Sequence, residues 1–396
     1  MSRKIGTVVR GVRAPILKEG DNIVAIVVDS LLAAQKEAGF EFADRDVVGI
    51  TESIVARTQG NYVSLQDIAT EINEKFMGDS LVVLFPILSR NRFSSLLKAI
   101  ALTGKKIYLI LNYPADEVGN HLMDIELMDQ ANINPYNQVL TEADYRKIFG
   151  EVVKHPFTGI DYVAYYKSLA KENQIEVILA NDSRVALNYS DNILVANIHE
   201  RQRTKKILAR TGAKCVFSLD EICSTKRDKA GYNLEVGLLG SNKASEDKIK
   251  LFPRDCQPIV EEIQREMFLK TGKLLEIMVY GDGAFKDPIG KIWELADPVV
   301  SPAFTQGLAG TPNEIKIKYI ADTELNHLNN AELEQAMRQK INEKAQDLTA
   351  QEASLGTTPR QLTDLLGSLC DLTSGSGDKG TPIIYIQGYF DNYASK

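Results

Sequence analysis

The sequence predicts an α/β protein of mixed α and β content, built from more than one folding unit. Short, apolar, β-branched segments alternate with segments of helical spacing, a rhythm that favours sheets with helices packed against them. The chain has 396 residues, of which 44% are hydrophobic and 25% are charged, as in ordinary folded proteins. At roughly 100 to 200 residues per domain, this length predicts two or three units.

Charge and cysteine content restrict the class of protein. The formal net charge of −7 argues against nucleic acid as the main partner, because an acidic surface repels phosphate polymers. The four cysteines have no paired CxxC spacing, so we expect reduced thiols. The N-terminus lacks an apolar signal region, and no run reaches the roughly 18 apolar residues that span a bilayer. We therefore expect a cytoplasmic protein with no membrane partner.

The first hundred residues already show the alternation. Residues 21 to 40 have helical spacing that ends at Gly39, and residues 46 to 56 are β-branched and predict a strand before the turn TQGN. Residues 64 to 76 predict a helix that begins at a serine cap with Asp67 three positions later. The pattern then gives a strand at LVVLFP, a helix over residues 90 to 103 and a strand at KKIYLILN.

The rest of the chain continues the pattern with different content. Between residues 114 and 230 we expect a helix over residues 161 to 172, strands at IEVILAN, NILVANI and KCVFS, and the basic helix HERQRTKKILARTG. Beyond it we expect a strand over residues 232 to 239, a helix over 255 to 272, the strand LLEIMVYGDG, a polar helix over 329 to 355, an apolar segment over 361 to 372 and the strand IIYIQG.

Two segments carry residue types suited to phosphate and metal. The loop TSGSGDKGTP holds Gly375, Gly377 and Gly380, and glycines let backbone N–H groups converge on a phosphate. It lacks P-loop spacing, so a flexible linker is the alternative. Asp282 closes an apolar strand and Asp287 follows, a placement that suits Mg²⁺ or an ordinary turn. Acidic residues Glu294 and Asp297 come shortly after.

Other polar residues are less informative. Asn242 lies between Ser241 and Lys243 after an apolar segment, where it would hold a nucleotide or simply form a turn. The histidines have no metal-ligand spacing, and no Ser or Cys nucleophile pattern is present.

Taken in order, several segments resemble the coenzyme F420-0:gamma-glutamyl ligase family. The similar stretches are RAPILKEGDNI, ITESIVARTQGN, EVGLLGSNKASEDKIKLFPRD, TGKLLEIMVYGDGAFKDP and SGSGDKGTPIIYIQG. The resemblance implies a ligase-like core with mixed sheets, formed by residues 1–113 and 231–396, with an inserted small α/β unit at 114–230.

The family resemblance also implies a chemistry. A GTP- or ATP-dependent amide ligase would use Mg²⁺ or Mn²⁺ to join a glutamate-like amino acid to a small-molecule carboxylate acceptor through an acyl phosphate, and it would be a homodimer. Two alternatives remain open, a catalytically silent nucleotide-binding homologue and a scaffold protein.

The resemblance carries over to particular positions. Those expected to contact nucleotide are Ala14, Pro15, Ile16, Leu17, Glu52, Ser53, Arg57, Asn242, Gly375, Ser376, Gly377, Asp378 and Gly380. Asp282 keeps a metal aspartate, but Leu239 and Ser376 stand where the family has further metal ligands. Either Asp287, Glu294 or Asp297 substitutes from another loop, or the metal site is depleted, or the activity has changed, and we take Asp287 as the candidate second ligand. The basic run Arg201, Arg203, Lys205 and Lys206 in the inserted unit is either a solvated helix face or a contact for an anionic substrate.

Overall fold

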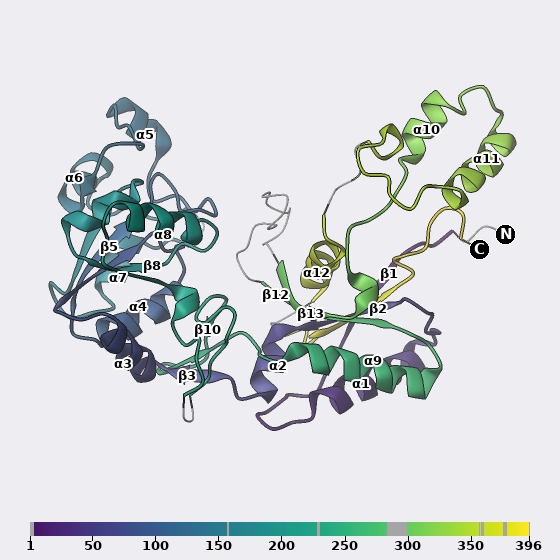
Figure 1. Cartoon of the computed structure of the whole chain (residues 1–396), viewed down its shortest axis with the longest axis horizontal. Helices are drawn as coiled ribbons and strands as arrows, with labels where there is room; N and C mark the ends of the chain where they lie inside the picture. The colour runs from purple at the N-terminus through teal and green to yellow at the C-terminus, as the bar shows by residue number, and fades with distance from the viewer. Residues whose placement is uncertain are drawn as a thin grey trace. The chain divides into compact units, whose positions relative to one another are not determined.

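The computed structural model describes residues 4–156, 158–227, 230–282, 299–355, 357, 360–374 and 378–395. The chain forms two compact units, which are Met1–Thr58 with Asp255–Lys396 and, separately, Gln59–Arg254. Within the described residues the strands form three sheets, so the predicted mixed α and β content is confirmed (Figure 1). The units divide at other positions than the predicted boundaries after residues 113 and 230, and an insertion at 114–230 stays a prediction.

The first unit is built around a mixed five-stranded sheet. Its order is β1 (Val8–Val12), β14 (Ile383–Gln387), β2 (Val47–Thr51), β12 (Glu276–Asp282) and β13 (Val299–Phe304). Only the β2 and β12 pair is parallel, and the other neighbours are antiparallel. The central β2 is buried on both sides, as its run of apolar residues predicts.

Helices cover both faces of this sheet (Figure 1). On one face, α1 (Ile23–Ala38) and α9 (Cys256–Thr271) contribute Leu31 and Ile263 to a core that is closed to water. On the other face, α12 (Leu362–Thr373) contributes Leu366 and Cys370. Both α1 and α9 end at a glycine in the left-handed region, Gly39 and Gly272, where a residue without Cβ is favoured. The helices α10 (Ile317–Thr323) and α11 (Asn330–Asn342) form a small separate cluster.

The second unit contains the largest sheet. Its order is β6 (Leu140–Thr141), β7 (Ile175–Leu179), β5 (Lys106–Leu111), β4 (Ser80–Leu84), β8 (Asn192–Val195) and β9 (Cys215–Ser218). All pairs are parallel except the short edge strand β6. Chain order runs outward from β4 in one direction and then, from β8, in the other. The strand order therefore reverses between β4 and β8, as it does in doubly wound α/β sheets.

The remaining elements of this unit are short. A three-stranded sheet consists of β10 (Asn242–Lys243), β11 (Lys248–Lys250) and β3 (Tyr62–Ser64). The helices are α3 (Leu65–Lys75), α4 (Phe93–Ala101), α5 (Ile125–Gln130), α6 (Glu142–Phe149), α7 (Tyr162–Lys167) and α8 (Arg201–Arg210). The predicted cap of α3 is confirmed, because Ser64 and Asp67 form a reciprocal capping box.

Three predicted elements differ from the structure. The strand over residues 46 to 56 ends at Thr51, and α2 (Glu52–Thr58) follows, because packing of the buried Val55 in a helix outweighs the strand preference of this β-branched residue. The helix over residues 329 to 355 stops at Asn342.

The strand predicted over residues 232 to 239 is wrong, since the backbone there turns. The Asn233 side chain accepts the N–H groups of Glu235 and Val236, at 3.0 and 3.1 Å, and this local bond competes with strand pairing. Gly237 and Gly240 adopt positive φ, which also favours a turn.

Candidate functional site

One edge of the five-stranded sheet gathers the predicted nucleotide-contacting segments. The strands β1, β2 and β12 run in the same direction, so their carboxyl ends lie together with the start of β14. The backbone confirms this closeness, because the Thr51 N–H donates to the carbonyl of Pro382 at 3.1 Å. Carboxyl ends of strands are where open α/β sheets commonly bind ligands.

A cavity of about 250 Å³ opens at this edge. Its lining residues come from the loop after β1, from the β2–α2 junction and from the segment before β14: Ala14, Pro15, Ile16, Leu17, Thr51, Ser53, Ile54, Arg57, Ser374, Gly380, Thr381 and Pro382. The lining combines apolar side chains, hydroxyl groups and one guanidinium, which is a suitable mixture for a small polar ligand.

The loop after β1 is anchored to the core and to α2. Leu17 is buried and packs into the core under the cavity, while the Gly20 N–H donates to the Thr58 carbonyl at 2.9 Å. Gly20 has φ of 86°, a conformation that glycine adopts without strain. In contrast, Ile16 beside the cavity is 85% exposed. The loop is therefore fixed at Leu17 and Gly20, while the apolar side chain of Ile16 is accessible to a ligand.

The charge at this edge favours an anion. Arg57 is exposed, and its guanidinium group makes no hydrogen bond or ion pair with any described residue. A neighbouring hollow of about 900 Å³ shares Thr381 with the cavity and is lined by further cations, including Arg13 and Lys379. Its lining also includes the acidic Asp29 and Glu37 of α1. Arg13 and Lys379 are sequence neighbours of the cavity residues Ala14 and Gly380, and these cations would attract phosphate groups.

The sequence-predicted residues have different outcomes. The structure brings seven of them into the lining of one cavity, Ala14, Pro15, Ile16, Leu17, Ser53, Arg57 and Gly380. Glu52 is only 2% exposed and is not part of the lining, and Asp378 is an exposed turn residue outside it.

Asn242 belongs to the second unit, in β10, so its convergence with Arg57 stays a prediction. Gly375, Ser376, Gly377 and Asp287 lie outside the described residues, as do Glu294 and Asp297.

Sequence reasoning missed the cavity residues Thr51, Ile54, Ser374, Thr381 and Pro382. Each lies within a few positions of a predicted one, so proximity in the sequence was the available signal.

The part of the chain that the structure describes contains no preformed metal site. Among the described residues, no group of three or more His, Cys, Asp or Glu side chains is placed to hold a cation. The backbone of Asp282 ends β12 at the same edge as Thr51. Leu239 is 1% exposed and has no atom that binds a hard cation. A metal here would depend on Asp282, Asp287 and oxygen atoms of a bound nucleotide.

Comparison with known proteins identifies the family. The model of a family described as F420-0:Gamma-glutamyl ligase matches residues 11–388. The chain belongs to this family. The match includes all the segments that form the cavity, and membership supports a function of the γ-glutamyl ligase type on small-molecule substrates. No curated protein matches the sequence. No helix among the described residues has the length and apolar character required to cross a membrane.

Proposed function

We propose that the protein is a nucleotide-dependent amide ligase that joins a glutamate-like amino acid to a small-molecule carboxylate through an acyl phosphate. The observation that carries this proposal is the 250 Å³ cavity at the carboxyl edge of the sheet, in a chain of the γ-glutamyl ligase family. The guanidinium of Arg57 and the loops that line the cavity would bind the triphosphate of GTP or ATP. This reaction needs no nucleophilic side chain of the protein.

The chemistry requires two displacements. An acceptor carboxylate oxygen attacks the γ-phosphorus, and the nucleoside diphosphate leaves with the electron pair of the broken P–O bond. The amine of the amino acid then attacks the acyl carbon, loses a proton and displaces inorganic phosphate. Arg57 would hold phosphate oxygens by charge-assisted hydrogen bonds, and the apolar Ile16 would cover the ligand from water. A bound Mg²⁺ or Mn²⁺ would neutralise phosphate charge.

Replacement of Arg57 by alanine should weaken nucleotide binding and leave the fold intact. Hydrogen bonds to a charged group contribute roughly 1.5–3 kcal/mol, so the dissociation constant for GTP or ATP should rise at least about tenfold. Calorimetry with each nucleotide plus Mg²⁺ or Mn²⁺ measures this. Arg265→Ala, at an exposed arginine of α9, is the matched control and should bind like wild type.

The activity itself is tested by product formation. Nucleotide, metal, glutamate and a deazaflavin phosphodiester with a terminal carboxylate should give phosphate and a product heavier by one glutamyl residue. Nucleotide binding without product from this acceptor or from other carboxylates would indicate a silent homologue. Absence of any nucleotide binding would contradict the proposal and favour a scaffold protein.

A separate prediction concerns the metal. Because a lone carboxylate seldom holds Mg²⁺ without nucleotide phosphates, wild type should bind Mn²⁺ weakly when no nucleotide is present. Asp282→Asn should remove the metal dependence of GTP binding, and Asp287→Asn should do so only if Asp287 is a ligand. Electron paramagnetic resonance of Mn²⁺ with and without GTP measures both. Tight Mn²⁺ binding in the absence of GTP would show that the site is not depleted.

We also propose a homodimer, which light scattering would test.

A further inference from the structure

The second unit contains a cavity of about 770 Å³ that the proposed ligase chemistry does not use. It lies at the carboxyl edge of the six-stranded sheet, since Phe85 follows β4, Asn112 follows β5, Asn181 follows β7 and Asn197 follows β8. The cavity therefore spans the point between β4 and β8 where the strand order reverses. This is the general position of ligand sites in doubly wound sheets.

A buried acceptor in the cavity wall lacks a partner. Asn197 is 4% exposed, and its Nδ2 donates to the hydroxyl of Thr204 at 3.2 Å. Its Oδ1 accepts no hydrogen bond from the described part of the chain. An unpaired buried polar atom is costly. Because Asn197 lines the cavity, a ligand that donates an N–H or O–H to Oδ1 would remove that cost.

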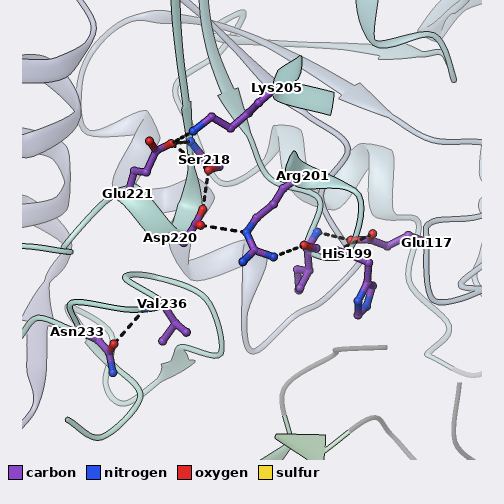
Figure 2. Close-up of polar contacts among 10 residues, drawn as sticks. Glu117, His199, Arg201, Lys205, Ser218, Asp220, Glu221, Asn233 and Val236 are labelled. Atoms are coloured by element: carbon purple, nitrogen blue, oxygen red, sulfur yellow. Dashed lines mark hydrogen bonds and ion pairs between the residues drawn. The ribbon is translucent and has the colours of Figure 1, made fainter. Parts of the chain in front are cut away.

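The basic residues of α8 divide into two sets. Arg201 donates to Asp220 at 3.0 Å and to the Ile198 carbonyl, and Lys205 pairs with Glu221 (Figure 2). These two cations therefore serve the structure. Arg203 and Arg210 instead line the cavity, and neither guanidinium group has a hydrogen bond or ion pair with a described residue. Positions 203, 207 and 210 share a helix face.

Most of the carboxylates that line the cavity already accept hydrogen bonds. Asp116 accepts the N–H groups of Leu88, Val118 and Asn120. Two further carboxylates also have partners. Asp182 accepts a hydrogen bond from Arg184 Nε at 2.8 Å, and Glu117 accepts from the backbone N–H groups ahead of α8.

Glu200 is the exposed exception, because its carboxylate makes no hydrogen bond or ion pair with a described residue. Two guanidinium groups and one carboxylate thus have no hydrogen-bond or ion-pair partner among the described residues. They favour an anion that also has a hydrogen-bond donor.

We propose that this cavity binds a small organic anion, with Arg203 and Arg210 on its phosphate or carboxylate oxygens and Asn197 Oδ1 on a donor of the same molecule. Arginine suits both kinds of oxygen because its planar fork donates two parallel bonds. The volume is in the range of small-molecule sites and accommodates a ligand much larger than inorganic phosphate, such as a nucleotide or a short acidic peptide.

Calorimetry on the full chain would test the site with three probes, AMP, L-glutamyl-L-glutamate and inorganic phosphate. AMP or the dipeptide should bind more tightly than inorganic phosphate, and the preferred probe shows whether phosphate or carboxylate is the natural anion. Arg203→Ala and Arg210→Ala should each weaken that binding at least about tenfold. Lys206→Ala is the matched control, because Lys206 is an exposed cation of the same helix outside the cavity lining.

Arg57→Ala separates this site from the cavity of the first unit, because the binding that Arg203→Ala and Arg210→Ala weaken should persist in this variant. Failure of all three probes to bind would overturn the proposal. The same holds if inorganic phosphate binds as tightly as both organic probes, if Arg203→Ala and Arg210→Ala bind like wild type, or if the binding is lost in Arg57→Ala.

Discussion

Replacement of Gly49 by alanine should destabilise the first unit by about 3 kcal/mol, at the upper end of the usual cost of overpacking a core. Gly49 lies in the central β2, and a Cβ at this position would be 2.3 Å from Cys370 Sγ and 3.3 Å from Tyr280 Cδ1. Cys370 is fully buried on α12, so neither β2 nor α12 can move without opening the core. Hydrogen exchange of peptides from β2 and α12 would measure the loss within this unit.

Removal of the sulfur should restore part of the stability. In Gly49→Ala with Cys370→Ala, the nearest atoms become the Cβ of residue 370 and Tyr280 Cδ1, both at 3.3 Å. The double variant should therefore be less destabilised than the sum of the single variants. Gly6→Ala is the control, because a Cβ there has no atom within 4 Å and should change the free energy of unfolding by less than about 0.5 kcal/mol. Simple additivity of the two core substitutions would show that the contact between α12 and β2 is not the cause.

The sequence predicted those elements whose signals are local and agree with their surroundings. The helix α1, to which the structure adds an Asn22 cap, was predicted from its apolar spacing and its terminal Gly39, two signals that agree on nearly the same bounds. The same is true of α3 with its capping box. By contrast, residues 232 to 239 have a strand-like apolar composition, and the backbone there is decided by Asn233 and two glycines. Turn chemistry at one residue outweighed the composition of the segment.

The cavity in the first unit was partly predictable for a different reason. Resemblance to the family indicated the β1 loop and Arg57, and both line it. No local signal showed that Thr51 and Thr381 meet there, because their closeness depends on the pairing of β2 with β14, which are distant in the sequence. The division of the basic run between the ion pairs of Arg201 and the unpaired Arg203 depends in the same way on the position of α8 beside β9.

Replacement of Glu117 by glutamine should make the second unit more stable at pH 8 and should hardly change it near pH 4. Burial raises the pKa of Glu117 from 4.5 to about 7, against the opposing effect of the N–H groups of Ile198 and His199, and the nearby Asp116 raises it slightly further. A folded-state pKa above the unfolded value means that the folded protein binds the proton more tightly. This stabilisation is therefore complete below about pH 4.5 and is lost as the pH rises through 7.

The expected size follows from the shift. At about 1.4 kcal/mol per pKa unit, a shift from 4.5 to about 7 gives a loss of about 3 kcal/mol in wild type between pH 4 and pH 8. The two oxygens of Glu117 accept separately from the Ile198 and His199 N–H groups, and glutamine keeps one oxygen that accepts from either of them. Glutamine has no proton to lose, so its profile should lack this loss. Glu117→Ala is the matched control, since it also does not titrate but leaves both N–H groups without their acceptor. It should be less stable than the glutamine variant at every pH.

Hydrogen exchange of peptides from β8 and α8 at several pH values measures the three profiles. Parallel profiles for wild type and Glu117→Gln would mean that the carboxyl group stays ionised across this range and that the N–H groups ahead of α8, rather than burial, control its charge.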